Sequence, residues 1–315
     1  MNKLFLFWVV LIAIPMSAQE LPYRQYMRDF VIRISEYAKG QNENFVVIPQ
    51  NGIELVTDNG EPYGKLSKPY LNAIDGHGQE SLFFGYAGND KPTPKKETRF
   101  LMSYLDRSKA VGNTILVTDY CAKVSKQEEA RRNNLAKGYI SFRAATRELT
   151  EVPLLANVNK QKVLRLSEVS NFLYLINPSA YSDRTSFIEA LAATEYDLLI
   201  IDLFFGDMPL TKDEVSRLSQ TKTGRARLVV CYMSIGEAED YRYYWEYDWD
   251  DQVPTWIAAE NPDWEGNYKV KYWHSEWQSI ILGNKTSYLD KILEAGFDGV
   301  YLDIIDGFEY FEGTH

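Results

Sequence analysis

Short apolar runs recur along the whole chain and predict strands. They lie at residues 45–48, 70–74, 114–117, 172–176, 197–203, 227–233, 255–258 and 299–303. Stretches with helical spacing separate most of these runs, as in residues 26–38, where Phe30, Ile34 and Tyr37 share one face. Strands that alternate with helices predict a parallel sheet. Eight of them favour an α/β fold, a (β/α)8 barrel of the TIM type.

The alternative organisation is two domains divided in the polar region around residues 150–169. However, residues 172–311 contain only five of the predicted strands, and an open half-barrel would expose unpaired edges to water. The three N-terminal strands complete the ring in the barrel interpretation. We therefore expect one barrel domain over residues 19–315.

Residues 1–18 predict a cleaved secretory signal. Lys3 precedes an apolar core at residues 4–14, and the segment ends in the small residue Ala18. A membrane anchor is the alternative, but the apolar run is shorter than the roughly 20 residues of a spanning helix. Pro15 also interrupts the end of the run. We expect a secreted or periplasmic protein with no membrane span after cleavage.

Composition narrows the classes of function. The formal net charge of −10 disfavours nucleic acid as a partner and suits cationic ligands. Cys121 and Cys231 fall in different predicted strands and are expected to be free buried thiols. With only His77, His274 and His315, a histidine-rich metal site is not expected. The chain has no nucleophile elbow, Walker loop or dinucleotide fingerprint, so we expect no cofactor.

Acidic and amide side chains follow several predicted strands. They are Gln50, Asn51, Asp75, Glu80, Asp202, Glu237, Glu239, Asp303 and Asp306. Any one of them can be a helix cap. In a barrel, however, the C-terminal strand ends share one rim, so the set converges there. Two converging carboxylates are the minimum for glycoside hydrolysis, in which one protonates the leaving oxygen and the other attacks or activates water.

Aromatic residues make up 14% of the chain and are concentrated in residues 241–249 and 272–277. Flat apolar faces of this kind stack on sugar rings. The alternative is that the rings cover the outside of the barrel or fix long loops.

Together these motifs resemble glycoside hydrolase family 114, secreted barrels related to endo-α-1,4-polygalactosaminidase. The resemblance rests on DLLIIDLFF, CYMSIGEAEDYRYYW, GNYKVKYWHSEWQ, AGFDGVYLDIIDGFEYF, FVVIPQNGIEL and IDGHGQESLFFGY. The last two pieces follow the GFDGVYLD strand in the family but come first here. We interpret this order as a circular permutation, which neighbouring chain ends in a barrel would tolerate. The alternative is a truncated or fused gene.

By that resemblance, Asp303 matches the aspartate that ends the fifth strand of the family, and Glu80 matches the glutamate after its seventh. The resemblance implies Asp303 as the nucleophile and Glu80 as the general acid/base, with Glu237 as the second candidate for the acid. A carboxyl separation of about 5 to 5.5 Å implies retention of configuration, and one of about 6.5 to 9.5 Å implies inversion.

The implied substrate is an α-1,4-linked galactosamine-containing polysaccharide or oligosaccharide, whose cationic amines suit an acidic mouth. The candidate substrate ligands are Asn51, Asp202, Tyr232, Glu237, Trp273 and Asp306. Two other functions remain open: a carbohydrate-binding barrel without catalysis, and an acidic scaffold of the cell envelope.

Overall fold

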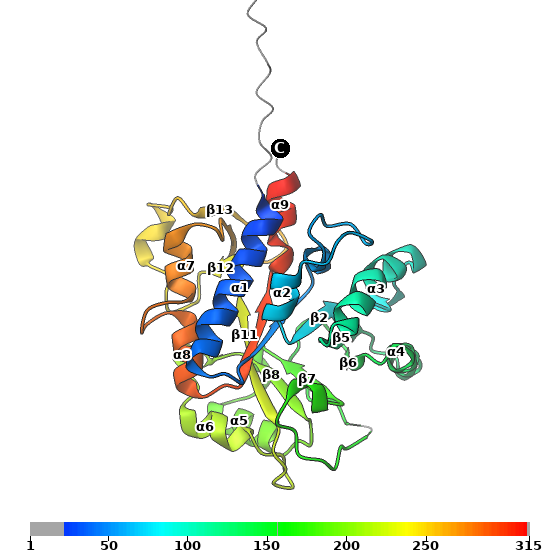
Figure 1. Ribbon diagram of the computed structural model, residues 1–315. Coiled ribbons are helices and arrows are strands. Elements are labelled where there is room, and N and C mark those ends of the chain that lie inside the picture. Colours follow the sequence, from blue (N-terminus) through cyan, green and yellow to red (C-terminus); the bar gives the residue numbers. More distant parts are fainter. Residues whose placement is uncertain (1–21, 156, 314–315) are drawn as a thin grey trace, which may run out of the picture.

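The computed structural model describes residues 22–155 and 157–313. Parallel strands lie at the centre of a mixed α/β fold, and helices cover their outer side (Figure 1). The predicted signal at residues 1–18 lies outside the described residues.

The central strands form two parallel sheets. The five-stranded sheet has the order β1 (Val46–Pro49), β15 (Gly299–Asp303), β11 (Leu228–Ser234), β8 (Leu198–Ile201), β7 (Phe172–Leu175). The three-stranded sheet has the order β2 (Gly76–Glu80), β5 (Thr114–Tyr120), β6 (Ile140–Ala144). An isolated parallel bridge between Gln50 and Gly78 joins β1 to β2.

The eight parallel strands follow one another in ring order along the chain. β6 lies beside β7, but no hydrogen-bonded ladder joins them within the described residues. The prediction of an α/β fold with a parallel sheet is therefore confirmed, whereas closure of the barrel stays a prediction.

Six of the eight predicted strands belong to this parallel set, and two predictions were wrong. Residues 70–74 lie mostly in a helix, α2 (Lys68–Ala73), which has a proline in its first turn. Residues 255–258 overlap β13 (Ile257–Glu260), which belongs to a separate antiparallel sheet. Strands β2 and β6 take their places in the ring.

Three antiparallel additions follow the ends of parallel strands. They are β3 (Phe84–Gly85) with β4 (Gly88–Pro92), β9 (Phe204–Phe205) with β10 (Met208–Pro209), and the sheet β12 (Glu237–Glu239), β14 (Asn267–Val270), β13. We call residues 237–270, which contain the last of these, the β12–β14 excursion. Inside it, Trp249 packs against Trp245 and Trp256, with ring centroids 5.1 Å apart in both pairs.

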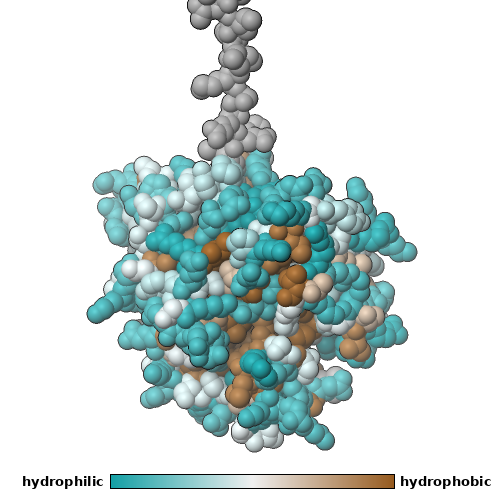
Figure 2. Space-filling model, in the orientation of Figure 1, coloured by the Kyte–Doolittle hydropathy of each residue, from teal (hydrophilic) through white to brown (hydrophobic). Residues whose placement is uncertain are grey.

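Helices surround the strands. They are α1 (Tyr23–Gln41), α3 (Lys95–Ala110), α4 (Val124–Lys137), α5 (Arg184–Ala192), α6 (Lys212–Leu218), α7 (Ser275–Ile281), α8 (Tyr288–Ala295) and α9 (Phe308–Gly313). Short 3-10 turns occur at Ile53–Val56, Leu166–Glu168, Pro178–Ala180, Tyr247–Asp250 and Ile305–Gly307. The face seen in Figure 1 is mostly hydrophilic, with hydrophobic residues showing near its centre (Figure 2).

The first and last described helices lie side by side (Figure 1). Arg24 of α1 forms an ion pair with Glu312 of α9 at 2.9 Å. A chain cut between β15 and β1 requires this proximity. Any closed barrel also brings its first and last strands together, so the circular permutation stays a prediction.

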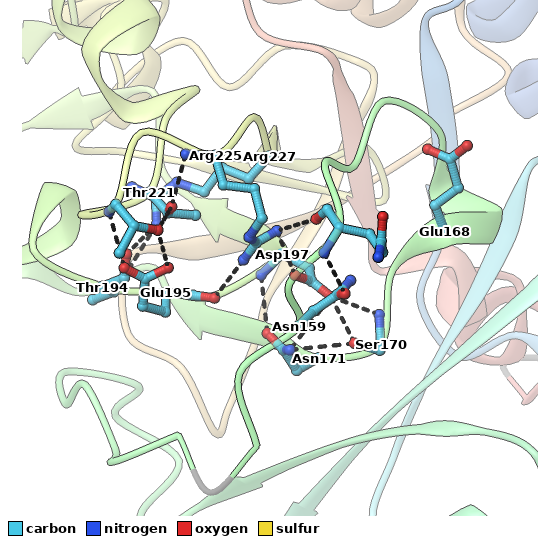
Figure 3. Close-up of polar contacts among 12 residues, drawn as sticks. Asn159, Glu168, Ser170, Asn171, Thr194, Glu195, Asp197, Thr221, Arg225 and Arg227 are labelled. Atoms are coloured by element: carbon cyan, nitrogen blue, oxygen red, sulfur yellow. Dashed lines mark hydrogen bonds and ion pairs between the residues drawn. The ribbon is translucent and has the colours of Figure 1, made fainter.

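The connection from β6 to β7, residues 145–171, contains no α-helix in its described part. A buried polar network fixes it to the start of β8 (Figure 3). The Asp197 carboxylate accepts hydrogen bonds from Ser170 N at 2.9 Å and Asn159 Nδ2 at 3.1 Å, and pairs with Arg225 at 2.9 Å. Side-chain bonds therefore hold a segment that lacks a helix.

One hydrophobic core cluster includes residues from Tyr23 to Phe311. Cys121 and Cys231 are buried and form no disulfide, which confirms the prediction of free thiols. Within the described residues, every helix is too short or too polar to cross a membrane. The proposed boundary between a signal and a single domain stays a prediction.

Candidate active site

A cavity of about 580 Å³ opens where the parallel strands end. Its wall contains Gln50 and Asn51 after β1, Glu80 at the end of β2, Asp202 after β8 and Asp303 at the end of β15. Parallel α/β folds place their ligands on this side of the strands. The predicted convergence of strand-end side chains is therefore found for most of the set.

Asp303 is held by the two strands that flank β15. Gln50, just after β1, donates from Nε2 to Asp303 Oδ1 at 3.0 Å. Tyr232 of β11 donates its hydroxyl to Asp303 Oδ2 at 2.7 Å. Burial, followed by the charge of Glu80, raises the pKa of Asp303 to about 7. This carboxyl group is therefore oriented by two donors and titrates near neutral pH.

Glu80 is held by a similar pair of donors. The Tyr120 hydroxyl at the end of β5 donates to Oε1, and Asn51 Nδ2 donates to Oε2 at 3.2 Å. Asn51 also accepts from the Glu80 backbone N at 3.1 Å. Asn51 has a φ of 60°, a left-handed conformation that asparagine adopts more readily than most residues. The PQN turn therefore places an amide beside each carboxylate.

The structure brings Asp303 and Glu80 into one cavity, and the charge of Glu80 acts on the pKa of Asp303. Their roles in a reaction stay predictions.

Asp306 lines the same cavity. Burial is the main cause that raises its pKa to about 8, and the charge of Asp303 is the next. Between them, Ile304 has a φ of 56°, an uncommon conformation for a β-branched residue. Its carbonyl lies so close to Gly236 that a Cβ there would be 2.2 Å from it. This strained bend lets two acids so near in sequence both reach the cavity.

Two other predicted ligands face the cavity with their charges already paired. Asp202 accepts from Arg242 at 2.9 and 2.7 Å, and Arg242 also donates to Glu239 at 2.6 Å. Glu237 accepts from Asn261 at 2.8 Å and from Lys269 at 3.1 Å. Glu237 is therefore already paired with a cation, Lys269, whereas the donors to Glu80 are the neutral side chains of Tyr120 and Asn51.

Trp273 is not part of the cavity wall. Its ring packs against Tyr23, Tyr26 and Phe311, with centroids 5.1, 5.6 and 4.8 Å away. These partners belong to α1 and α9, so this aromatic residue packs between the first and last described helices. Its position does not support the prediction that Trp273 contacts substrate, whereas Asn51 and Tyr232 do line the cavity.

Several lining residues were not named as candidate ligands from the sequence, although two of them lie in the aromatic stretch at residues 241–249. They are Tyr120, Arg147, Glu148, Tyr174, Tyr241, Arg242 and Trp264. A longer estimate of the strand at 114–117 would have reached Tyr120. Arg147 lies in the β6–β7 connection, which shows no periodic pattern.

The cavity wall is strongly acidic. It contains the acids Glu80, Glu148, Asp202, Glu237, Glu239, Asp303 and Asp306 against the bases Arg147 and Arg242. In the described part of the chain, no group of three His, Cys, Asp or Glu side chains is arranged to hold a metal ion. The wall therefore suits a ligand with positive charge.

Parts of the chain are similar to a known protein family and to three uncharacterized proteins. Residues 175–315 match the glycoside-hydrolase family GH114. An uncharacterized protein of Methanocaldococcus jannaschii is 41% identical over 152 residues, which are 48% of this chain and 42% of that protein. An uncharacterized protein of Thermotoga maritima is 52% identical over 81 residues, 26% of this chain and 24% of its own length. An uncharacterized protein of Deinococcus radiodurans is 37% identical over 123 residues, which are 39% of this chain and 37% of that protein. The chain thus matches less than half the length of each of these relatives.

Proposed function

We propose that the protein hydrolyses an α-1,4-linked galactosamine-containing polysaccharide, since residues 175–315 match the glycoside-hydrolase family GH114. One observation carries the proposal. Asp303 and Glu80, from strands far apart in sequence, line a single cavity, and each is fixed by two side-chain donors. A pair of carboxyl groups is the equipment that glycoside hydrolysis needs.

In this proposal Asp303 attacks the anomeric carbon, and Glu80 first protonates the leaving oxygen and then activates water. The donors Gln50 and Tyr232 aim the Asp303 carboxylate and leave no freedom for it to rotate away. The charge of Glu80 is the second cause of the raised pKa of Asp303, so the two carboxyl groups interact electrostatically. The proposed reaction needs Glu80 as the proton donor and Asp303 in its ionised form.

The acidic wall supports a cationic amino sugar as the substrate unit. Of the seven carboxyl groups in the cavity wall, three are paired with Arg242 or Lys269, and the remaining four outnumber the one other cation in the wall, Arg147. Such a field raises the local concentration of a polymer that carries ammonium groups. The predicted signal at residues 1–18 fits export to the compartment in which such polymers occur.

The test is release of reducing ends from partially deacetylated galactosaminogalactan. Asp303→Asn and Glu80→Gln are each expected to lower turnover at least about 1,000-fold, because each removes one half of the carboxylate pair. Asp29→Asn, on the exposed side of α1, is the control and should retain full turnover. Near-normal turnover in either active-site variant would refute its role. Binding of polymer by the wild-type protein without release of reducing ends would favour a non-catalytic carbohydrate-binding barrel instead.

A further inference from the structure

The aromatic side chains of the β12–β14 excursion divide into two groups. Trp245, Trp249 and Trp256 pack ring against ring inside it. Trp264 differs, since it is 53% exposed, lines the cavity, and has no ring contact with another described residue. A large apolar face left open to water at the rim of a pocket is typical of a binding surface.

The turn that carries Trp264 is well fixed, although the indole itself is free. Trp264 N donates to Asn261 O at 3.2 Å, and Asn267 N donates to Trp264 O at 3.1 Å. Gly266 N donates to Glu260 Oε1 at 3.0 Å, and the φ of Gly266 is 79°. The backbone between β13 and β14 therefore fixes the point from which the indole extends, which lowers the entropy cost of ordering this turn on binding.

Tyr241 offers a second exposed ring to the same cavity. It is 57% exposed, and its hydroxyl donates to Glu239 Oε1 at 2.6 Å. The guanidinium of Arg242 lies 5.1 Å from the centroid of its ring. These contacts hold the ring at the rim, and its exposed surface remains available to a ligand.

We propose that Trp264, assisted by Tyr241, forms a subsite that binds a sugar unit of the polymer beyond the two units joined by the cleaved bond. The proposal rests on the proposed function. The indole takes the apolar face of a pyranose ring, and an ammonium group on that sugar adds a cation–π attraction.

A remote subsite makes binding depend on chain length. Short oligosaccharides fill only the units at the carboxylate pair, whereas longer ones also reach Trp264. Binding energy from these remote units then supports cleavage of longer chains more than of short ones.

The test measures binding separately from turnover, by calorimetric titration of the Asp303→Asn variant with α-1,4-linked galactosamine dimers and hexamers. Adding Trp264→Ala is expected to raise the Kd for the hexamer about tenfold, equivalent to about 1.4 kcal/mol. The same change should raise the Kd for the dimer less than about threefold. Trp264→Phe, which keeps a smaller ring, should lose less than Trp264→Ala.

Tyr247→Ala provides the matched control. Tyr247 belongs to the same excursion and is 97% exposed, but it does not line the cavity. Hexamer affinity that is no weaker in Trp264→Ala than in Tyr247→Ala would overturn the subsite, as would equal losses for dimer and hexamer. If Asp303→Asn binds neither oligosaccharide, the proposed function fails together with the subsite.

Discussion

The guanidinium of Arg147 lies 4.1 Å from the centroid of the Tyr120 ring. The Tyr120 hydroxyl donates to Glu80, so the contact reaches a proposed catalytic residue through one intermediate ring. Arg147 also donates to Gly85 O at 2.9 Å and to Ser81 Oγ at 3.1 Å. These bonds tie the β6–β7 connection to the loop that follows Glu80, and they make Arg147 a positioning residue.

Replacing Arg147 tests this positioning role. Arg147→Met keeps the length of the side chain but removes a cation–π contact that is typically worth about 0.5 to 2 kcal/mol. We expect kcat to fall about tenfold with a smaller change in KM, because orientation of Glu80 matters most in the transition state. Lys109→Met is the control, since Lys109 lies 5.8 Å from the centroid of the Tyr139 ring, which is outside the cavity. Equal losses in the two variants would remove Arg147 from the site.

The hydroxyl of Tyr232 controls the ionisation of Asp303. The pKa of Asp303 is raised to about 7, and the Tyr232 hydrogen bond opposes that rise by stabilising the ionised form. Because Asp303 must be ionised to attack, turnover is expected to increase as pH rises through about 7.

Tyr232→Phe removes the donor, so this limb of the pH profile should move upward by about one unit. Tyr174→Phe is a suitable comparison, because Tyr174 lines the cavity and no hydrogen bond joins it to Asp303 within the described residues. A profile that instead falls as pH rises through about 7 would assign Asp303 the role of general acid.

Arg242 joins two buried carboxylates, Asp202 and Glu239. Loss of the shared cation leaves both buried carboxylates without a positive charge to compensate them. Arg242→Met is therefore expected to lower the free energy of unfolding by about 3 to 5 kcal/mol, measured in urea. Arg242→Lys should recover only part of that loss, because lysine cannot donate in the bidentate geometry. If Arg242→Met unfolds like the wild type, the cluster is not structural, and Asp202 regains its place as a candidate ligand.

Asp306 makes stability depend on pH in a defined direction. Its pKa in the folded state, about 8, lies above its ordinary value, so the folded protein binds more protons than the unfolded chain between about pH 4 and pH 8. Its contribution is present at low pH and is lost as pH rises through about 8.

Asp306→Asn removes the cost of burying an ionised carboxylate above about pH 8. We expect it to stabilise the protein by about 2 kcal/mol at pH 9 and to have little effect at pH 5, in urea titrations at both values. Asp29→Asn should give equal small effects at the two values. A gain at pH 5 as large as that at pH 9 would contradict the raised pKa.

The strands that the sequence predicted correctly are those whose own side chains fill the core. β8, with the sequence LLII, is buried throughout and is found easily from its apolar run. β2, with the sequence GHGQE, was missed although it is largely buried. Its glycines make room for neighbours, since a Cβ on Gly78 would lie 2.1 Å from the Tyr301 hydroxyl. When side chains of neighbouring strands fill the core next to a glycine-containing strand, that strand shows no apolar pattern in its own sequence.

The candidate site was predictable where it depends on strand ends and not where it depends on long connections. Asp303 ends a strand that the sequence predicted, so its place at the cavity follows from the fold class. Glu80 ends β2, a strand that the sequence did not predict, and it was singled out by the family resemblance. The positions of the aromatic side chains were not predictable in this way, because a cluster of aromatic residues in the sequence does not show whether each ring packs in the core or lines the cavity. Trp273 lies in a dense aromatic cluster and packs between helices, whereas Trp264 stands alone in a turn and reaches the cavity.

The missing ladder between β6 and β7 has a mechanical consequence for the cavity. Arg147 belongs to the segment that leaves β6, at the only junction between ring neighbours in the described residues that has neither a ladder nor a bridge. Local opening begins where the fewest backbone bonds must break. Separation of β6 from β7 would break the contact between Arg147 and Tyr120 while the five-stranded sheet remains intact. Mild denaturant should therefore abolish activity before it unfolds the protein.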